Sequence, residues 1–184
     1  MGRDISGASA VFFDRDGVLI VDKGYQIDTD SIEFFPDTIS AVLALDRRFK
    51  KIVITNQSGI GRGYFTARDV ERFNARLSES LENFGIIIDG WYFCPHSPEE
   101  NCDCRKPRPG LLRQAAVDFN LDLKNSWIVG DKSSDIEAGH AAGTSAILVK
   151  TGFAGLEAGH SVLTPEFVSA NLSEAVDIIN RSVN

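Results

Sequence analysis

The sequence predicts an α/β protein built on a doubly wound, mainly parallel β-sheet, and two observations carry this prediction. Short apolar runs, each typical of a strand buried on both faces, alternate along the chain with segments whose apolar residues recur at helical spacing. The polar residues that could act in catalysis or bind a metal follow directly after these runs, where parallel strands would present them at one edge of the sheet. The chain has 184 residues, 43% hydrophobic and 24% charged, so we expect one domain over residues 1–184.

Each expected element has its own signal in the sequence. The strands are short apolar runs that end in a polar residue or a turn: 9–13, 51–55, 90–93, 126–129 and 146–149. The helices have apolar residues at helical spacing: 36–49, 66–84, 109–119, 134–142 and 172–180. Pro36 suits a first helical turn, Thr66 suits an N-cap, and Gly85 suits a helix end. Strands that alternate with helices indicate a Rossmann-like arrangement.

The charge balance limits the kinds of partner. A net charge of -7 argues against broad attraction to nucleic acid or to anionic lipid. No apolar run approaches the length of a membrane span, and residues 1–6 lack the apolar stretch of a signal peptide. We therefore expect a cytoplasmic monomer that binds neither membrane nor nucleic acid. An anionic ligand would need local cations, and five lie in loops or at the ends of elements: Arg62, Arg105, Lys106, Arg108 and Lys132.

All three cysteines lie within eleven residues. Cys94, Cys102 and Cys104, together with His96, form a Cys₃His set of the kind that closes a structural Zn²⁺ site. The alternative is a disulfide, a spare thiol and a surface histidine, but an odd number of cysteines with a Cys-x-Cys pair suits a metal better. Arg105 and Lys106 follow immediately, so a rigid zinc loop would aim two cations at an anion.

Carboxylates and hydroxyls follow three of the predicted strands. Asp14 and Asp16, in Asp14-Arg-Asp-Gly17, can serve as nucleophile and general acid/base, although the same pattern also occurs in turns and calcium loops. Asp131 could complete an oxygen-rich Mg²⁺ site with Asp14, and Asp135 could steady that site, unless one of them only caps the next helix. Thr55 and the donor-rich Asn56-Gln-Ser-Gly59 loop could cradle a phosphate.

The order of these residues, Asp-x-Asp, Thr, Lys and Asp at successive strand ends, resembles the haloacid dehalogenase (HAD) superfamily of phosphotransferases. The resemblance extends from about Val11 to Val149. It implies a HAD fold in which Asp14 is the nucleophile and Asp16 the acid/base. It further implies that Thr55 and Lys106 clamp the phosphoryl group, and that Mg²⁺ is held at three positions: Asp14, Asp16 and Asp131.

A narrower resemblance concerns the segments Phe13-Asp-Arg-Asp-Gly17, Asp22-Lys-Gly-Tyr25, Thr55 to Phe65, the cysteine loop and Gly130-Asp-Lys132. Together they look like the capless D-glycero-D-manno-heptose 1,7-bisphosphate 7-phosphatase family, which carries a zinc loop. That family removes the C7 phosphate of a sugar bisphosphate in nucleotide-activated heptose biosynthesis. The resemblance implies catalytic Mg²⁺, structural Zn²⁺, a catalytic part for Arg105 and a set of substrate-binding residues: Asp22, Lys23, Gly24, Tyr25, Asn56, Gln57, Ser58, Arg62 and Lys132.

Three alternatives stay open at this point. The related histidinol-phosphate phosphatase domain shares the aspartates and zinc ligands, and it has the same short gap between His96 and Cys102. Signalling receiver domains also place an aspartate, a hydroxyl and a lysine on a parallel sheet. Their phosphoacceptor follows a middle strand, however, whereas Asp14 follows the first. A zinc-stabilised interaction module without activity is disfavoured because no expected catalytic position is lost.

Overall fold

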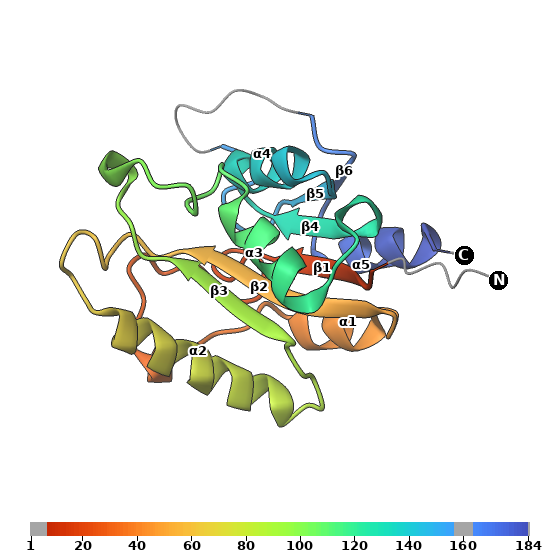
Figure 1. Ribbon diagram of the computed structural model, residues 1–184. Coiled ribbons are helices and arrows are strands. Elements are labelled where there is room, and N and C mark those ends of the chain that lie inside the picture. Colours follow the sequence, from red (N-terminus) through yellow and green to blue (C-terminus); the bar gives the residue numbers. More distant parts are fainter. Residues whose placement is uncertain (1–6, 157–163, 184) are drawn as a thin grey trace.

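The computed structural model describes residues 7–156 and 164–183. In this part of the chain, six strands form one sheet in the order β3-β2-β1-β4-β5-β6, and every neighbouring pair is parallel (Figure 1). The strands are β1 (Ser9–Phe13), β2 (Phe49–Asn56), β3 (Gly90–Cys94), β4 (Trp127–Gly130), β5 (Ser145–Val149) and β6 (Phe167–Ser169). This is the strand order of a Rossmann-like sheet, so the predicted fold class is confirmed.

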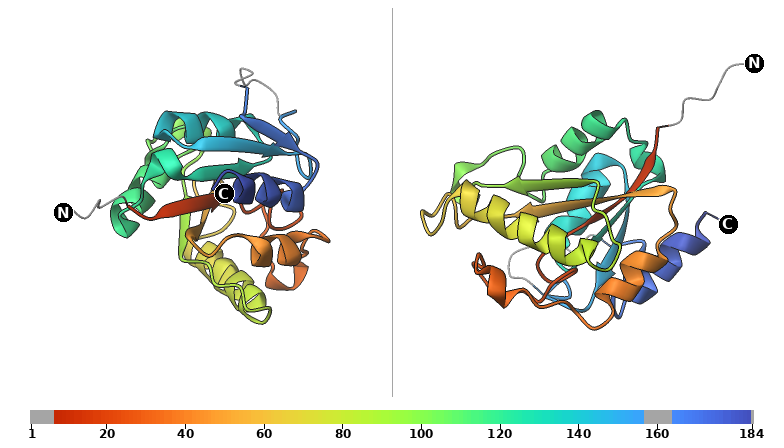
Figure 2. Two further views of the ribbon diagram at one scale, coloured as in Figure 1. Left: turned by 90° about the vertical axis from the view of Figure 1, so that its right-hand side faces the viewer. Right: turned by 90° about the horizontal axis from the view of Figure 1, so that it is seen from below.

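Helices cover both faces of the sheet. The α-helices of the described chain are α1 (Thr38–Ala44), α2 (Ala67–Glu82), α3 (Gly110–Phe119), α4 (Ser133–Ala142) and α5 (Leu172–Arg181). Three short 3₁₀ turns lie between elements: Thr29–Ser31, Pro98–Glu100 and Leu123–Asn125. Figure 2 shows α1, α2 and α5 on one face and α3 and α4 on the other. The sheet therefore forms the middle of three layers.

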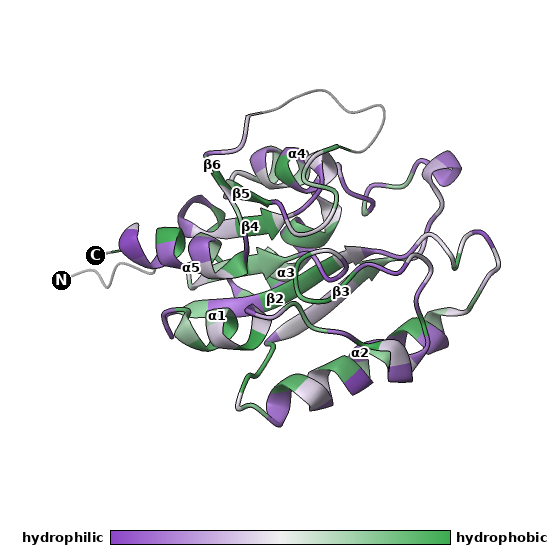
Figure 3. Ribbon diagram, turned by 180° about the vertical axis from the view of Figure 1, so that it is seen from behind, coloured by the Kyte–Doolittle hydropathy of each residue, from purple (hydrophilic) through white to green (hydrophobic). Residues whose placement is uncertain are grey.

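Side chains alternate along β1 between two hydrophobic cores. Val11 and Phe13 pack with α1, α2 and α5, while Ala10 and Phe12 pack with α3 and α4. All four are fully buried, as expected for a central strand whose successive side chains point to opposite faces. The hydropathy colouring shows the same arrangement, with apolar strands between helices whose outer faces are polar (Figure 3).

The helix predicted over residues 36–49 is wrong in its second half. Helix α1 covers only Thr38–Ala44, and Phe49 instead begins β2, where it pairs in register with Ser9. Phe49 is 2% exposed, so burial of its ring in the sheet core outweighs the helical spacing. Leu43, which the spacing placed on the buried face, is 54% exposed. Strand β6 was not predicted, because its sequence Phe-Val-Ser has only two consecutive apolar residues, fewer than the roughly four to eight that indicate a strand.

The other elements follow their local signals. Thr66 caps α2, and its hydroxyl and the carboxylate of Asp69 form a reciprocal capping box. Gly85 has a φ of +80°, a conformation that favours glycine after a helix end. Phe84 lies beyond the helix and is 54% exposed, so it does not join the predicted buried face.

The strand order reverses between β1 and β4, and that reversal positions the site. In such sheets the crevice beyond the carboxyl ends at the reversal is where ligands bind. Asp14 follows β1 and Asp131 follows β4, so the two carboxylates come from the strands that flank the reversal. The described residues form no separate cap domain above this edge, and none of their helices is long and apolar enough to cross a membrane.

Candidate active site

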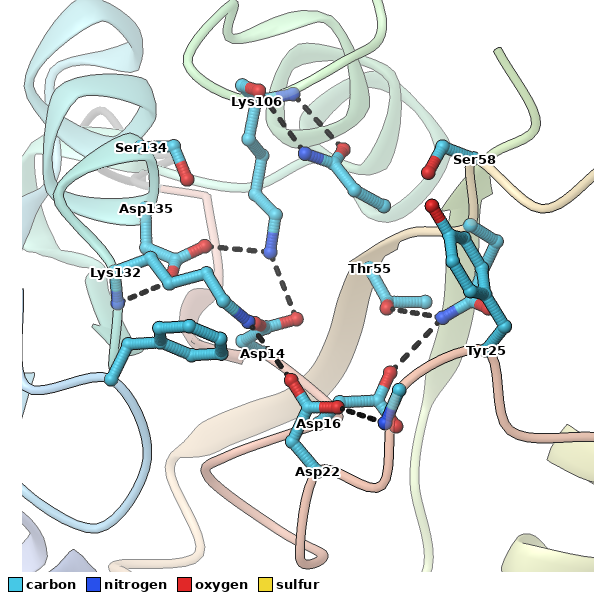
Figure 4. A pocket seen from close by; sticks show the side chains of 14 residues that line it. Asp14, Asp16, Asp22, Tyr25, Thr55, Ser58, Lys106, Lys132, Ser134 and Asp135 are labelled. Atoms are coloured by element: carbon cyan, nitrogen blue, oxygen red, sulfur yellow. Dashed lines mark hydrogen bonds and ion pairs between the residues drawn. The ribbon is translucent and has the colours of Figure 1, made fainter. Parts of the chain in front are cut away.

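A cavity of about 300 Å³ opens at the carboxyl edge of the sheet (Figure 4). Its walls come from the loops after β1, β2, β4 and β5 and from the residue that follows the cysteine loop. The lining residues are Asp14, Asp16, Asp22, Gly24, Tyr25, Thr55, Asn56, Gln57, Ser58, Lys106, Lys132, Ser134, Asp135 and Phe153. The structure thus brings most of the predicted site residues to one place.

Lys106 lies at the bottom of this cavity and binds two carboxylates. Its Nζ is 2.9 Å from Oδ1 of Asp14 and 2.6 Å from Oδ1 of Asp135, and it donates to the carbonyl oxygen of Ile54 at 3.1 Å. Burial alone would raise the pKa of Asp14, but the charges of Lys106 and Lys132 outweigh it and hold that pKa below its usual value. Asp14 is therefore kept ionised, which a nucleophilic carboxylate requires.

Asp14, Asp131 and Asp135 form a cluster that suits a divalent cation. One carboxylate oxygen from each lies within 4.8 Å of the others. Oδ2 of Asp131 accepts from the N–H of Phe153 at 2.8 Å, whereas its buried Oδ1 accepts no hydrogen bond in the described chain and lies 3.7 Å from Nζ of Lys132. Burial and the charge of Asp14 raise the pKa of Asp131 to about 7. Three buried carboxylates whose oxygens lie this close together fit Mg²⁺, which would relieve the repulsion between their charges.

Two glycines make room for the carboxylate of Asp131. A Cβ at Gly17 or at Gly152 would overlap its carboxylate oxygens. The backbone from β1 and the backbone after β5 can therefore both close on Asp131 only because these residues lack a side chain.

Asp16 does not join the metal-compatible cluster with its side chain. The guanidinium of Arg15 lies 2.9 Å from Oδ2 of Asp16, and Gln57 donates to the same oxygen at 3.0 Å. Burial raises the pKa of Asp16; Arg15 opposes this shift and Asp14 adds to it. A carboxyl group with a raised pKa beside an ionised one is the arrangement that general acid/base chemistry uses. The sequence analysis did not single out Arg15.

Asn56, the last residue of β2, and Gln57, the next residue, contact side chains and main chain of the predicted catalytic residues. Nε2 of Gln57 donates to Oγ1 of Thr55 at 2.9 Å as well as to Asp16. The amide of Asn56 donates to the carbonyl of Lys106 and accepts from its N–H, each at 3.1 Å. The sequence predicted that these two side chains bind substrate, and the structure shows both of them in contact with residues predicted to be catalytic.

The mouth of the cavity is built by Asp22, Tyr25, Lys132 and Phe153. Nζ of Lys132 is 3.4 Å from Oδ2 of Asp22 and 4.7 Å from the centre of the Phe153 ring. Burial alone would lower the pKa of Lys132, but the surrounding carboxylates raise it, so this lysine is charged. Tyr25 packs edge-on against Tyr64, with ring centroids 4.8 Å apart. Phe153 was missed from the sequence because a lone aromatic residue after a strand carries no signal.

Two predicted substrate-binding cations do not line the cavity. Lys23 donates to the carbonyl of Ser31 at 2.9 Å and pairs with Glu33 at 2.8 Å. Arg62 lies 3.7 Å from Glu99. Both cations are paired on the surface, whereas Gly24 and Ser58 from the same two loops do line the cavity.

The cysteine loop converges as its spacing predicts. Sγ of Cys104 lies 3.2 Å from that of Cys94 and 3.4 Å from that of Cys102, and Nδ1 of His96 lies 3.3 Å from Sγ of Cys104. These separations are too long for bonded sulfurs, and all three thiols are free, so the disulfide alternative is excluded. They are close to the ligand separations of a tetrahedral site with metal–ligand bonds of about 2.0–2.3 Å, so the set fits Zn²⁺.

A second cavity of about 480 Å³ adjoins the first and is rich in cations. Asn56, Lys106, Lys132 and Ser134 line both cavities, and the second is completed by residues of the cysteine loop and its exit: Pro98, Asn101, Cys102, Arg105, Pro107 and Arg108. Nη1 of Arg105 lies 3.4 Å from the carbonyl of His96, and Arg108 donates to the carbonyls of Asn101 and Cys102. The carbonyls of the cysteine loop therefore hold the wall that carries these arginines.

Comparison with known proteins agrees with this geometry. A profile of HAD-hydrolase-like proteins matches residues 103–175. D-glycero-β-D-manno-heptose-1,7-bisphosphate 7-phosphatase of Haemophilus ducreyi is 41% identical over 155 residues, which span 79% of this chain and 85% of that protein. The enzyme of the same name from Helicobacter pylori strain 26695 is 46% identical over 132 residues, 71% of this chain and 76% of that protein.

A solved structure is also similar over nearly the whole chain. The D,D-heptose 1,7-bisphosphate phosphatase of B. bronchiseptica, complexed with magnesium and phosphate, has a TM-score of 0.84 at 29% identity and covers 95% of this chain and 99% of its own. From the strand-end aspartates, the zinc loop and these relatives together, the chain belongs to the D-glycero-β-D-manno-heptose-1,7-bisphosphate 7-phosphatase family of HAD-like hydrolases.

Proposed function

We propose that this protein is a Mg²⁺-dependent phosphatase that removes the C7 phosphate of D-glycero-β-D-manno-heptose 1,7-bisphosphate. The observation that carries the proposal is the pair of adjoining cavities. One holds the buried Asp14 with Lys106, and the other is lined by Arg105 and Arg108. Two neighbouring anion sites suit a substrate with two phosphates, and the curated relatives carry this activity in their names.

The chemistry follows from the roles of two aspartates. A carboxylate oxygen of Asp14 attacks phosphorus while the bond to the sugar C7 oxygen breaks and Asp16 gives its proton to that oxygen. Water then attacks the aspartyl phosphate, Asp16 takes up its proton, and inorganic phosphate leaves with Asp14 restored. Lys106 and Thr55 hold the transferring oxygens and balance their charge.

The second cavity would hold the anomeric phosphate. Arg105 and Lys132 line it, and Lys132 also lines the catalytic cavity, so one lysine can reach both ends of the sugar. Asp22, Gly24, Tyr25 and Ser58 would contact the sugar between the phosphates. We assign no direct contact to Lys23 or Arg62, because each pairs with a glutamate outside the cavity.

Two metals complete the proposal. Mg²⁺ would bind Asp14 and Asp131 through carboxylates and Asp16 through its main-chain oxygen; when bound, it lowers the charge on the transferring phosphoryl group. Asp135 would support this metal site indirectly, because its carboxylate pairs with Lys106. Zn²⁺ would bind Cys94, His96, Cys102 and Cys104 and hold the loop that carries Arg105 and Lys106.

We also propose a location, a pathway and an oligomeric state for this protein. We place the reaction in the cytoplasm, in nucleotide-activated heptose biosynthesis, and we expect a monomer with no nucleic-acid partner. The net charge of -7 supports the last point.

The test is phosphate release from four substrates: the β and α anomers of the heptose bisphosphate, histidinol phosphate and 4-nitrophenyl phosphate. We expect the highest kcat/KM with the β anomer, release of one of its two phosphates, and no turnover by Asp14→Asn. A higher kcat/KM with histidinol phosphate would replace the substrate assignment. Release of no more phosphate than enzyme present would instead point to a receiver-like phosphoacceptor.

A further inference from the structure

Arg15 is the first by volume among the side chains that are fully buried in the described part of the chain. The proposed phosphatase mechanism gives it no role. It is 1% exposed, although it carries a permanent charge. A charge removed from water is costly unless partners satisfy it, so its contacts are informative.

The guanidinium of Arg15 uses separate nitrogens for two partners. Its Nε and Nη2 lie 3.1 Å and 2.9 Å from Oδ2 of Asp16, and both also reach Oδ1. Its Nη1 donates at 2.9 Å to Oδ1 of Asn74. The guanidinium carbon lies 4.5 Å from the centre of the Phe73 ring, so α2 holds the group by stacking as well.

Asn74 is a polar residue on the buried face of α2. It is 6% exposed, and its neighbours on that face are Val70, Phe73 and Leu77. Its amide oxygen meets Arg15, which lies 59 positions earlier in the chain. A rigid helix thus fixes one end of the guanidinium while the other end fixes the plane of the Asp16 carboxyl group.

We propose that Asn74 and Arg15 form a positioning pair that aligns the carboxyl group of Asp16 for proton transfer to the leaving oxygen. The inference rests on the proposed phosphatase function and on the acid/base role of Asp16. A planar fork restricts the rotation of a carboxyl group more than a single donor does. Proton transfer depends on that alignment, because a shift of about 1 Å can cost on the order of 10²-fold.

The leaving group provides the test. The sugar oxygen is an alkoxide and needs a proton as it departs, whereas 4-nitrophenolate departs without one. We therefore compare kcat/KM, which reports the steps up to phosphorylation of Asp14, for the bisphosphate and for 4-nitrophenyl phosphate. In Asn74→Leu the ratio of the two values should fall by about tenfold, and in Arg15→Lys by about 10²-fold, within the 10²–10⁴-fold range of acid/base assistance.

Two variants serve as controls. Asn74→Asp keeps an acceptor for Nη1 of Arg15 and should restore the wild-type ratio to within about threefold. Ser78 lies one turn further along α2, and its hydroxyl donates a hydrogen bond to Glu82. Ser78→Ala should therefore leave kcat/KM unchanged for both substrates.

The ratio of two kcat/KM values does not depend on how much of a sample is folded, so partial unfolding cannot imitate the expected result. Equal losses on both substrates in Asn74→Leu and Arg15→Lys, or a wild-type ratio in both, would overturn the proposal. The wild-type substrate ranking tests the phosphatase assignment separately. If the wild-type protein prefers another alkyl phosphate, the same ratio with that substrate tests the positioning pair.

Discussion

Asn56 offers a sharp test of how the catalytic lysine is held in place. Its amide makes two hydrogen bonds of 3.1 Å to the main chain of Lys106, one with the N–H and one with the carbonyl. The residue at the end of β2 is thereby joined to the residue that leaves the zinc loop. Asn56→Ala removes both bonds and adds no new group.

The expected magnitude follows from these two bonds. A hydrogen bond of this kind contributes about 0.5–1.5 kcal/mol, so about 1–3 kcal/mol of the preference for the native position of Lys106 is lost. Nζ of Lys106 must lie beside the transferring phosphoryl group, and each 1.4 kcal/mol corresponds to about tenfold in rate. We therefore expect kcat to fall by about 5- to 150-fold, with KM within about threefold of the wild-type value.

Steady-state phosphate release from the heptose bisphosphate measures both constants. Ser58→Ala is the matched comparison, because Ser58 lies two residues after Asn56 and lines the cavity without a side-chain bond to Lys106. A large rise in KM at unchanged kcat for Asn56→Ala would show that Asn56 binds substrate, as the sequence alone suggested, and would refute the clamp.

Three further changes probe other parts of the site. In Gly152→Ala the new Cβ would overlap the carboxylate of Asp131, so phosphate release should fall by about 5- to 150-fold, since overpacking costs about 1–3 kcal/mol; unchanged kcat at saturating Mg²⁺ would contradict this. Removal of zinc by chelation, followed by Mg²⁺ replenishment, should abolish most activity, and full activity with zinc absent by elemental analysis would disprove the scaffold role. Arg105→Ala should reduce kcat/KM for the bisphosphate far more than for 4-nitrophenyl phosphate, and equal losses would reject its contact with the second phosphate.

The central site was predictable because its residues are placed by local rules. A buried strand followed by a polar residue predicts where Asp14, Thr55 and Asp131 emerge, and parallel strands bring those ends to one edge. The zinc ligands are close in sequence, so their spacing alone brings their donor atoms together. In both cases the chain has few other ways to place the side chain.

The partners of long side chains were not predictable by the same rules. Lys23 and Arg62 lie in the expected loops, but a neighbouring glutamate binds each of them, and no periodicity indicates which way a flexible cation turns. The contact between Arg15 and Asn74 joins residues 59 positions apart and depends on how α2 packs on the sheet. One signal was available: a polar Asn74 among the apolar residues of a helix face indicates a buried partner.

The helix predicted to reach Phe49 failed for a related reason. A helix and a buried strand would both place an apolar residue at position 49. The sequence alone does not show which of the two has the lower free energy. A ring that is 2% exposed between two layers gains more than one at the end of a short, partly exposed helix. The spacing of apolar residues therefore indicates which secondary structures are possible locally, and the packing of distant segments determines which of them forms.

The charges at the sheet edge connect the two metals to substrate binding. Five carboxylates meet three cations in and directly behind the cavity wall: Asp14, Asp16, Asp22, Asp131 and Asp135 with Arg15, Lys106 and Lys132. Each of these cations already contacts a carboxylate, so much of its charge is balanced before a phosphate binds. A bisphosphate therefore needs positive charge in addition to that of Lys106 and Lys132, and the residues offer two sources. One is a divalent ion at the carboxylate cluster of Asp14, Asp131 and Asp135, and the other is the wall of the second cavity that carries Arg105 and Arg108. A protein with a net charge of -7 can thus attract a highly anionic sugar when these two local arrangements, one built on oxygen ligands and one held by the cysteine loop, add to the charges of Lys106 and Lys132.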